Sequence, residues 1–269
     1  MSDGIAVSVI IPAYNEEGTI AQVVEDFKAL PEVTEVIVVD NNCRDDTARL
    51  AAEAGARVVV ETEAGYGCAL RAGMNAARGD ILVLTEADGS FKARDLAKLL
   101  AYSPDAGMIL GTRTTRQMVE QGANMGFILR WGNVAAAKIL ELLWYVPHEP
   151  RLTDVGCTYR ALWKTTFEAI KEGLTEKGPG FSPEMICECL RHGIRVIEVP
   201  VSYHARCAGE SAHSGSAWSV VRTALKMFRC IFRKRLSRSP RKIGPRGLPE
   251  GHDKIFADNE LRGSDNTHP

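Results

Sequence analysis

The chain has 269 residues, of which 45% are hydrophobic and 25% are charged. This length and apolar content allow one large domain with a buried core, and they argue against global disorder. The net charge is −1, but residues 222–246 contain ten Lys and Arg and no Asp or Glu, so the rest of the chain carries −11. An acidic body with a basic C-terminal segment predicts an anionic surface nearby, either a membrane or a nucleic acid.

The seven cysteines include no Cys-x-x-Cys pair, which favours the reduced cysteines of a cytosolic protein over a zinc site or a disulfide framework. No basic segment precedes the first apolar run, so we expect no signal peptide. Charged residues at Arg130, Lys138 and Glu141 interrupt the longest apolar stretch, which is shorter than the ~18 residues a membrane helix needs. We therefore expect a cytoplasmic protein, soluble or peripheral on the cytoplasmic membrane face.

Strand and helix signals alternate through the first half of the chain. The apolar runs of strand length are Val7–Pro12, Val36–Val39, Arg57–Val60 and Ile81–Thr85, and the segments of helical spacing between them are Glu16–Leu30, Asp45–Ala54 and Tyr66–Ala77. Strands that are apolar throughout and separated by helices predict an α/β fold with a mostly parallel central sheet and helices on both faces. Ligands of such a sheet bind at the carboxyl ends of its strands.

The second half is less regular. It contains the expected helices Phe127–Tyr145, Ser182–His192 and Trp218–Arg235, and the expected strand Ile194–Val199. The helix 218–235 is amphipathic and basic. From Ser237 onward Pro, Gly and charged residues dominate, which is typical of a disordered tail. We therefore predict one domain over residues 1–236 and a polar tail over 237–269.

Each of the first four expected strands ends in a polar loop. These loops are Ala13–Glu17, Asp40–Thr47, Glu63–Gly67 and Glu86–Ser90. One acidic loop means little, because acidic residues commonly cap helices. Four polar loops at the strand ends of a doubly wound sheet predict a binding site there.

The pair Glu86-x-Asp88 is the most informative of these features. Two carboxylates at i and i+2 leave a rigid strand on the same side, where they can ligate one Mg²⁺ or Mn²⁺. Such an ion neutralises the charge of a departing diphosphate. The alternative is that one of the two acids only caps a helix beginning near Lys92.

For other strand-end residues taken singly, the structural interpretation is at least as strong as the functional one, and for Asp40 and Tyr14 it is the stronger. Asp40 is suited to hydrogen bonds with a base or ribose, and Tyr14 to stacking on a base, but both residue types are also common in turns. The amides of Gly65–Gly67 open a helix and are suited to anionic oxygen, with Arg71 one turn later. The pattern lacks the third glycine of a dinucleotide fingerprint, since Leu70 takes its place.

These residues together resemble the family 2 inverting glycosyltransferases of GT-A fold. The resemblance covers about residues 5–235 and is carried by Val7–Glu17, Val38–Asp40, Asp45–Thr47, Gly79–Asp80 ahead of Glu86–Asp88, Gly111–Arg113 and Thr153–Arg160. The run Glu198–Val201, followed by Tyr203, Arg206, Gly209, Glu210 and Ser211, resembles the C-terminal motif of dolichyl-phosphate mannose synthase-like members.

The resemblance implies a set of site residues. The implied donor-binding residues are Pro12, Tyr14, Glu16, Asp40, Gly67, Arg71, Glu86, Ala87 and Asp88, with Glu86 and Asp88 holding the metal. Arg113 and Arg206 would face phosphates with their fork of donors, and Asp154 would lie near the reacting centre. Arg160, Ser211 and His213 are the expected acceptor-binding residues.

Two positions depart from the family pattern. The first acid of its Asp-x-Asp pair is Glu86 here, which keeps the charge but has a longer reach. The family's Gly-x-Ser-Lys motif is Gly209-Glu210-Ser211-Ala212, so the phosphate-binding lysine is missing and His213 replaces it imperfectly. This second departure leaves the acceptor open.

The expected reaction transfers a sugar, with inversion, from a UDP- or GDP-linked donor to a polyprenyl phosphate. The segment 218–246 is expected to touch the membrane surface, because basic amphipathic helices bind anionic leaflets, although the helix can instead pack on the domain. A hydroxyl acceptor would need a base such as Asp154 or Glu184. The alternatives are a transferase for a soluble acceptor, a nucleotidyltransferase, a catalytically silent nucleotide-binding domain and, last, a nucleic-acid-binding protein.

Overall fold

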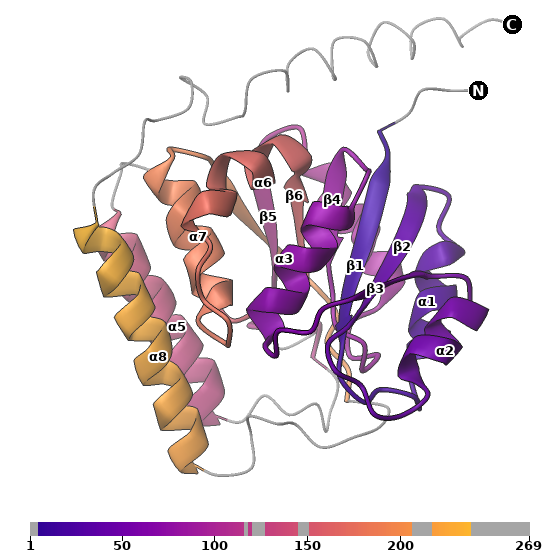
Figure 1. Ribbon diagram of the computed structural model, residues 1–269. Coiled ribbons are helices and arrows are strands. Elements are labelled where there is room, and N and C mark those ends of the chain that lie inside the picture. Colours follow the sequence, from indigo (N-terminus) through magenta and orange to yellow (C-terminus); the bar gives the residue numbers. More distant parts are fainter. Residues whose placement is uncertain (1–4, 116–117, 120–126, 145–150, 206–216, 238–269) are drawn as a thin grey trace, which may run out of the picture.

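The computed structural model describes residues 5–115, 118–119, 127–144, 151–205 and 217–237, and its described strands form one sheet (Figure 1). The sheet has the order β3-β2-β1-β4-β6-β5-β7. Its strands are β1 (Val7–Ala13), β2 (Val33–Asp40), β3 (Arg57–Val60), β4 (Ile81–Leu84), β5 (Met108–Thr112), β6 (Arg160–Trp163) and β7 (Val196–Pro200). β6 runs antiparallel to both of its neighbours, and the other paired strands are parallel. The predicted mostly parallel sheet is confirmed.

Helices cover both faces of this sheet. They are α1 (Ile20–Lys28), α2 (Thr47–Glu53), α3 (Tyr66–Ala76), α4 (Leu96–Ala101), α5 (Phe127–Leu143), α6 (Lys164–Ile170), α7 (Phe181–Arg191) and α8 (Ala217–Leu236), with short 3₁₀ turns at Ala93–Asp95 and Lys171–Gly173. None of the helices in the described ranges is both long enough and apolar enough to cross a membrane. The predicted tail 237–269 lies outside the described residues beyond Ser237.

Alternate side chains of each central strand enter opposite cores. Ile10 of β1 belongs to a core that also contains residues of α3, α5, α6, α7 and α8. Its neighbours Val9 and Ile11 belong to a second core with residues of α1, α2 and α4. Successive strand residues point to opposite faces, so a strand that is buried on both faces must be apolar throughout. This is why the first four strands are visible in the sequence.

Among the described residues, β5, β6 and α6 are elements that the sequence analysis did not predict, whereas α4 follows the turn at Ala93–Asp95, close to the helix start considered near Lys92. β6 has only four residues, and all of them are buried. Because the first of them is the charged Arg160, the segment does not have the apolar pattern of a buried strand. It lies between β4 and β5, so its burial comes from its neighbours in the sheet rather than from an apolar pattern of its own.

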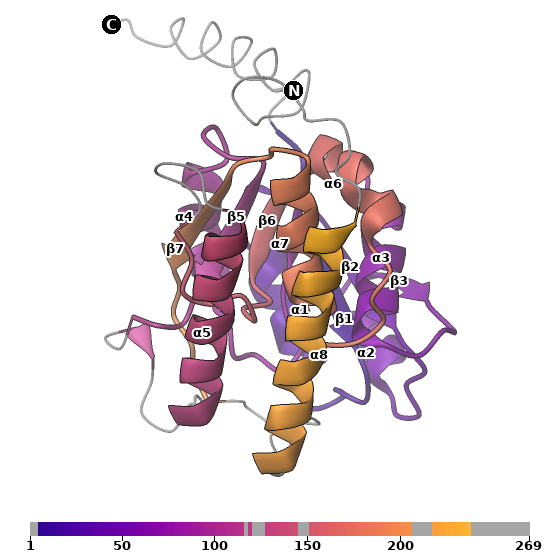
Figure 2. The same cartoon turned by 90° about the vertical axis from the view of Figure 1, so that its left-hand side faces the viewer.

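Helix α8 is part of the folded domain. It lies beside α5 and α7 (Figure 2), and its inward side chains Met227 and Ile231 join the first core. Lys234, whose side chain is 8% exposed, lies with its Nζ 2.8 Å from Glu184 and 2.9 Å from Glu188, and it also donates to the carbonyl of Gly173. Burial alone lowers the pKa of Lys234, but these two carboxylates raise it above its ordinary value. The lysine therefore joins α8 to α7 through two buried charges.

We expect Lys234→Met to lower the free energy of unfolding by about 3–5 kcal/mol, because it leaves two buried carboxylates without their shared cation. Lys226→Met is the matched control, since Lys226 is exposed on the same helix. Urea unfolding followed by circular dichroism measures both. Equal stability of the two variants would contradict the role given to Lys234.

Candidate active site

A cavity of about 720 Å³ opens at the carboxyl ends of β1, β2 and β4. Its lining comes from the loops that follow these strands and β3, together with the segment before α7. The lining residues are Pro12, Ala13, Tyr14, Glu16, Asn41, Asn42, Arg44, Ala64, Gly65, Tyr66, Ala69, Glu86, Ala87, Asp88, Gly178 and Pro179. Six residues expected from the sequence to bind a donor, namely Pro12, Tyr14, Glu16, Glu86, Ala87 and Asp88, therefore share one cavity.

Asparagines join the loops at this edge of the sheet. Asn41 donates to the carbonyls of Glu61 and Glu63 and accepts from the Gly65 amide at 2.8 Å. Asn15, at φ 55°, accepts from the Arg44 amide at 2.8 Å. Asparagine tolerates this left-handed backbone better than most residues, and its short amide can satisfy neighbouring backbone groups. These bonds hold the loops after β1, β2 and β3 against one another.

Glu86 and Asp88 lie on the wall of this cavity, on the loop after β4. The Asp88 carboxylate accepts from the Ser90 amide at 3.0 Å, and its residue is only 2% exposed. Glu86 accepts from the Thr158 hydroxyl at 2.8 Å, and its second oxygen lies 3.4 Å from the Ser90 hydroxyl. The longer side chain at position 86 is thus oriented by hydroxyls from two different loops.

This donor set fits a divalent cation. Two acidic residues line one cavity, and carboxylate oxygens are the protein ligands that Mg²⁺ and Mn²⁺ use alongside water and phosphate oxygens. The cavity is roomy enough for a diphosphate beside the pair. The alternative turn role is also visible for one of the two acids, since the Asp88 carboxylate accepts from the Ser90 amide two residues along the chain.

Gly65, Gly67 and Arg71, which were expected to bind anionic oxygen, bind other parts of the protein in this structure. The Gly67 amide donates to the Lys177 carbonyl at 2.8 Å, and the Gly65 amide is taken by Asn41, so these amides do not offer the expected anion site. The Arg71 guanidinium donates to the carbonyls of Leu174 and Glu176. In this structure Gly67 and Arg71 of α3 bind the segment 174–177, and their expected role in donor binding stays a prediction.

Glu184, a candidate base for a hydroxyl acceptor, is also a structural residue. It is fully buried and accepts from the amides of Thr175 and Glu176 at 2.8 and 2.7 Å. Lys234 and Arg233 neutralise its charge. Glu184 therefore secures the chain just before Gly178 and Pro179, which form one side of the cavity.

Glu176, Glu184 and Cys230 lie close enough together to suggest a metal site. The cations of α8 already contact both carboxylates, with Arg233 2.7 Å from Glu176. Burial raises the pKa of the Cys230 thiol to about 12, so it stays protonated at neutral pH and is a poor metal ligand. The cluster is an ion-pair anchor.

Asp154 is buried and forms a two-pronged ion pair with Arg113. Its carboxylate lies 2.8 Å from Nε and 3.0 Å from Nη2 of the guanidinium, and it also accepts from the Arg113 amide. Burial alone would raise the pKa of Asp154, but the charge of Arg113 holds this pKa below its ordinary value. A carboxylate held in this way is a weak base. The role of Asp154 as a base is therefore disfavoured, and neither Asp154 nor Arg113 lines the cavity described above.

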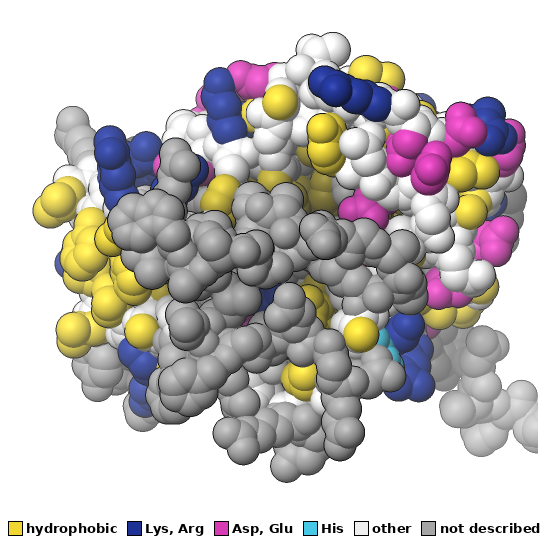
Figure 3. All heavy atoms as spheres, turned by 90° about the horizontal axis from the view of Figure 1, so that it is seen from below, with side chains coloured by type: hydrophobic (Ala, Val, Ile, Leu, Met, Phe, Trp, Pro, Cys, Tyr) yellow, Lys and Arg dark blue, Asp and Glu magenta, His cyan; other side chains and the backbone are white. Residues whose placement is uncertain are grey.

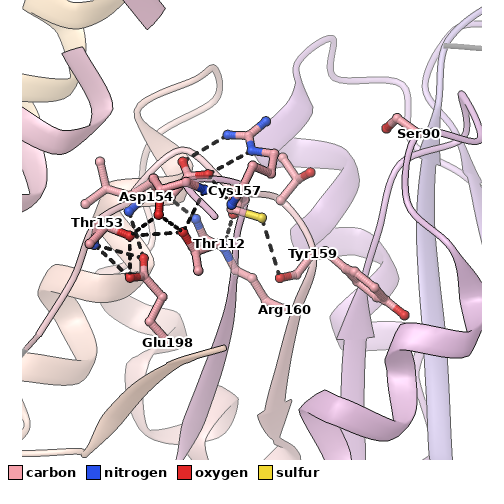
Figure 4. A network of polar contacts seen from close by, with 12 residues as sticks. Ser90, Thr112, Thr153, Asp154, Cys157, Tyr159, Arg160 and Glu198 are labelled. Atoms are coloured by element: carbon pink, nitrogen blue, oxygen red, sulfur yellow. Dashed lines mark hydrogen bonds and ion pairs between the residues drawn. The ribbon is translucent and has the colours of Figure 1, made fainter. Parts of the chain in front are cut away.

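A second carboxylate fixes the loop that carries Asp154 (Figure 4). Glu198 of β7 accepts from the amides of Thr153 and Asp154 and from the Thr153 hydroxyl at 2.7 Å. Burial raises the pKa of Glu198 above its ordinary value, against the effect of these donors. Because a carboxylate of Glu198 takes the only hydroxyl proton of Thr153, the hydroxyls of Thr112 and Thr114 must donate to Thr153 when they bond with it.

Arg160 is not an acceptor-binding residue in this structure. It is 1% exposed, and its guanidinium donates to the carbonyls of Val155, Cys157 and Ser182 (Figure 4 shows its position beneath the 153–157 loop). The expectation failed because the motif's arginine lies inside β6, where it supplies donors to loop carbonyls. The other expected acceptor residues, Ser211 and His213, and the phosphate-facing Arg206 lie outside the described residues.

Asp40 is near the cavity without lining it. Its carboxylate accepts from the Cys43 amide at 2.8 Å, which is the turn role that the sequence analysis left open. Arg44 is the cation that the sequence analysis overlooked on the cavity wall. The sequence feature that could have indicated Arg44 is its position in the second strand-end loop. Thr158 was also missed, because only the fold brings β6 next to the loop that carries Glu86.

Known proteins share both the sequence and the fold of this chain. The model of glycosyl transferase family 2 matches residues 8–142. An uncharacterized glycosyltransferase of Mycobacterium tuberculosis is 34% identical over 230 residues, covering 85% of this chain and 99% of the relative. The undecaprenyl-phosphate mannosyltransferase of Micrococcus luteus is 32% identical over 222 residues, covering 78% of this chain and 88% of the relative.

The solved structures that match include the glucosyl-3-phosphoglycerate synthase of Mycobacterium tuberculosis in complex with Mn²⁺, UDP and glucosyl-3-phosphoglycerate. Its TM-score is 0.65 at 19% identity, and the match covers 92% of this chain and 82% of the synthase. At this level of identity the likeness is one of fold. The GT-A fold expected from the sequence is confirmed.

We expect Asp154→Asn to lower the free energy of unfolding at pH 7 by about 3–5 kcal/mol, because it leaves the Arg113 guanidinium buried without its counterion. The folded pKa of Asp154 is lowered, so its contribution is present above the unfolded pKa of about 3.9 and is lost as the pH falls through the folded pKa. The difference in the free energy of unfolding between the variant and the wild type should therefore become smaller at acidic pH. Chemical unfolding at several pH values measures it.

Replacing both partners separates charge from packing. Arg113→Met combined with Asp154→Leu should recover much of the stability lost in Asp154→Asn, since apolar residues often replace a buried ion pair without net cost. A double variant as unstable as the single one would show that the hydrogen bonds to the backbone, rather than the paired charges, govern this site.

Proposed function

Because the chain belongs to glycosyl transferase family 2, we propose that it transfers a sugar from a nucleotide-diphosphate donor to a polyprenyl phosphate, with inversion at the anomeric carbon. That it is a glycosyltransferase follows from the family itself. The observation that most supports the proposed site is the convergence of Glu86 and Asp88 with Tyr14 in one cavity at the carboxyl ends of the strands. The UDP- or GDP-linked donor would occupy this cavity.

The donor's parts match the cavity wall. Tyr14 is 58% exposed at the rim, which leaves its ring available to stack on a nucleobase. Glu86 and Asp88 would hold Mg²⁺ or Mn²⁺, which when bound supplies positive charge to the diphosphate as it leaves. Arg44, exposed on the same wall, adds a cation of the protein's own. The solved relative in complex with Mn²⁺ and UDP supports this class of ligand.

Transfer with inversion needs one displacement. An oxygen of the acceptor attacks the anomeric carbon and forms the new C–O bond while the bond to the donor's diphosphate breaks, and the diphosphate leaves with the electron pair. The residues of this chain bind and orient the donor, and the fold shields Asp88, which is 2% exposed, from solvent.

The proposed acceptor class is supported by the chemistry of the two candidate bases, which the fold makes unsuitable for a hydroxyl acceptor. A hydroxyl acceptor needs a residue to take its proton, but Asp154 and Glu184 are buried and bound to cations. A phosphate acceptor is already ionised at neutral pH and needs no such residue. The undecaprenyl-phosphate mannosyltransferase of Micrococcus luteus supports a lipid-linked phosphate. We therefore place the reaction at the cytoplasmic face of a membrane.

A soluble acceptor is the second candidate. It is favoured by Ala212, which occupies the position of the family's phosphate-binding lysine, and by the fold shared with a glucosyl-3-phosphoglycerate synthase. A phosphorylated small acceptor would equally need no general base. The two candidates share the donor site and differ only in the acceptor.

The donor site is tested by thermal shift with UDP-glucose, UDP-GlcNAc and GDP-mannose, each with Mn²⁺. One donor at 100 times its dissociation constant should stabilise the protein by about 2.7 kcal/mol. We expect Asp88→Asn to abolish the metal-dependent part of this shift and to lower kcat at least ~10²-fold, because it keeps the side-chain shape and the bond from Ser90 but removes the charge.

The matched control is Asp105→Asn, an exposed acid after α4. It should retain both the shift and the turnover. Full metal-dependent binding in Asp88→Asn would remove the proposed metal assignment, and binding without turnover in the wild type would leave the chain a silent nucleotide-binding domain.

The acceptor is tested by supplying undecaprenyl phosphate in detergent or 3-phosphoglycerate to the enzyme with its preferred donor. We expect transfer to the lipid phosphate and none to the soluble acid, since the candidate bases are occupied and the named relative uses a lipid phosphate. Mass spectrometry of the products measures both. Transfer to the soluble acid alone would establish the second candidate.

A further inference from the structure

Helix α8 carries an apolar stripe on its outward face. Leu225, Phe232 and Leu236 are 61%, 47% and 85% exposed. Their spacing of seven and four residues places them on one line along the helix. The inward residues Met227 and Ile231 are buried against the domain, so the stripe lies on the opposite side of α8, which the described part of the chain leaves exposed.

Cations flank this stripe on both sides. The residues from 225 to 236 include the exposed cations Lys226, Arg229, Arg233 and Arg235, and α8 contains no Asp or Glu. Arg233 is bound to Glu176, and Arg235 lies over the Trp144 ring at 5.9 Å. Lys226 and Arg229 make no ion pair with any residue of the described ranges. Their charge is therefore offered outward.

The neighbouring helix extends the same surface. Leu142, near the end of α5, is 75% exposed, and α5 lies side by side with α8 (Figure 2). Figure 3 shows hydrophobic side chains gathered on this side of the molecule with Lys and Arg side chains next to them. An apolar stripe bordered by cations matches a surface that offers both hydrocarbon and negative charge.

We propose that the outward face of α8, formed by Leu225, Lys226, Arg229, Phe232 and Leu236, docks on the surface of an anionic phospholipid bilayer. Its apolar residues enter the boundary between headgroups and acyl chains, and Lys226 and Arg229 contact lipid phosphates. The helix lies along the surface, because its opposite face is packed on the domain. This inference rests on the proposed function for its purpose, since it brings the cavity to the membrane that holds a lipid-linked acceptor.

The packing of α8 rules out its deletion, which would be the simplest test of this proposal. Deleting α8 would remove Met227, Ile231 and the buried Lys234 from the domain, so loss of binding in such a variant would report unfolding. Substitutions on the exposed face avoid this. Leu225→Gln, Phe232→Gln and Leu236→Gln together change only side chains that are about half exposed or more.

The experiment is vesicle flotation of the full chain without donor or acceptor. Vesicles of phosphatidylcholine alone are compared with vesicles that contain phosphatidylglycerol. We expect the wild type to float with the anionic vesicles only, and to be released by high salt. The triple glutamine variant and Lys226→Gln with Arg229→Gln should each lower the bound fraction at least tenfold.

The control is Val60→Gln with Tyr102→Gln, which removes exposed apolar side chains that lie at the end of β3 and after α4. It should float like the wild type, and circular dichroism should show that every variant is folded. A wild type that does not float overturns the proposal, as does a dimer in sedimentation that the triple substitution dissociates, since the face would then belong to a second copy. Because no sugar transfer is involved, either result leaves the proposed transferase activity to its own tests.

Discussion

Buried carboxylates that bind loop backbone are the interaction on which the site depends. Glu198 accepts two amides of the segment that carries Asp154, and Glu184 accepts two amides of the segment that precedes the cavity wall at Gly178. Loops at the carboxyl edge of a parallel sheet cannot pair their amides with strands, and buried amides without partners are costly. Carboxylates from β7 and α7 therefore accept the amide hydrogen bonds that the carbonyls of a further strand would otherwise accept.

The charge of these carboxylates must itself be balanced, and this links distant parts of the chain. Asp154 is neutralised by Arg113, and Glu184 by Lys234 and Arg233 of the last described helix. The C-terminal helix is thus connected to the cavity wall through one buried acid. The same helix completes the domain with its inward face and leaves Leu225, Phe232 and Leu236 exposed on its opposite face.

These duties also explain which residues of the family motifs act on ligands. A polar residue in a motif is equally suited to holding the loop and to holding the substrate, and the partners that the fold places beside it distinguish the two roles. Arg160 and Arg71 bind carbonyls of the protein, whereas Glu86 and Asp88 line the cavity. The position of the Glu86 carboxylate is further fixed by the Thr158 hydroxyl, which donates to it at 2.8 Å.

The sequence by itself determined the α/β class, the first four strands and the acidic pair, because strands buried on both faces must be apolar and the loops after them meet at one edge. The tertiary structure alone decided the antiparallel β6, the occupation of the Gly67 amide, and the roles of Arg71, Arg160 and Glu184. Local pattern specifies which face of an element is buried. It does not specify which distant carbonyl or carboxylate meets a polar side chain, since those partners lie up to 114 residues away along the chain.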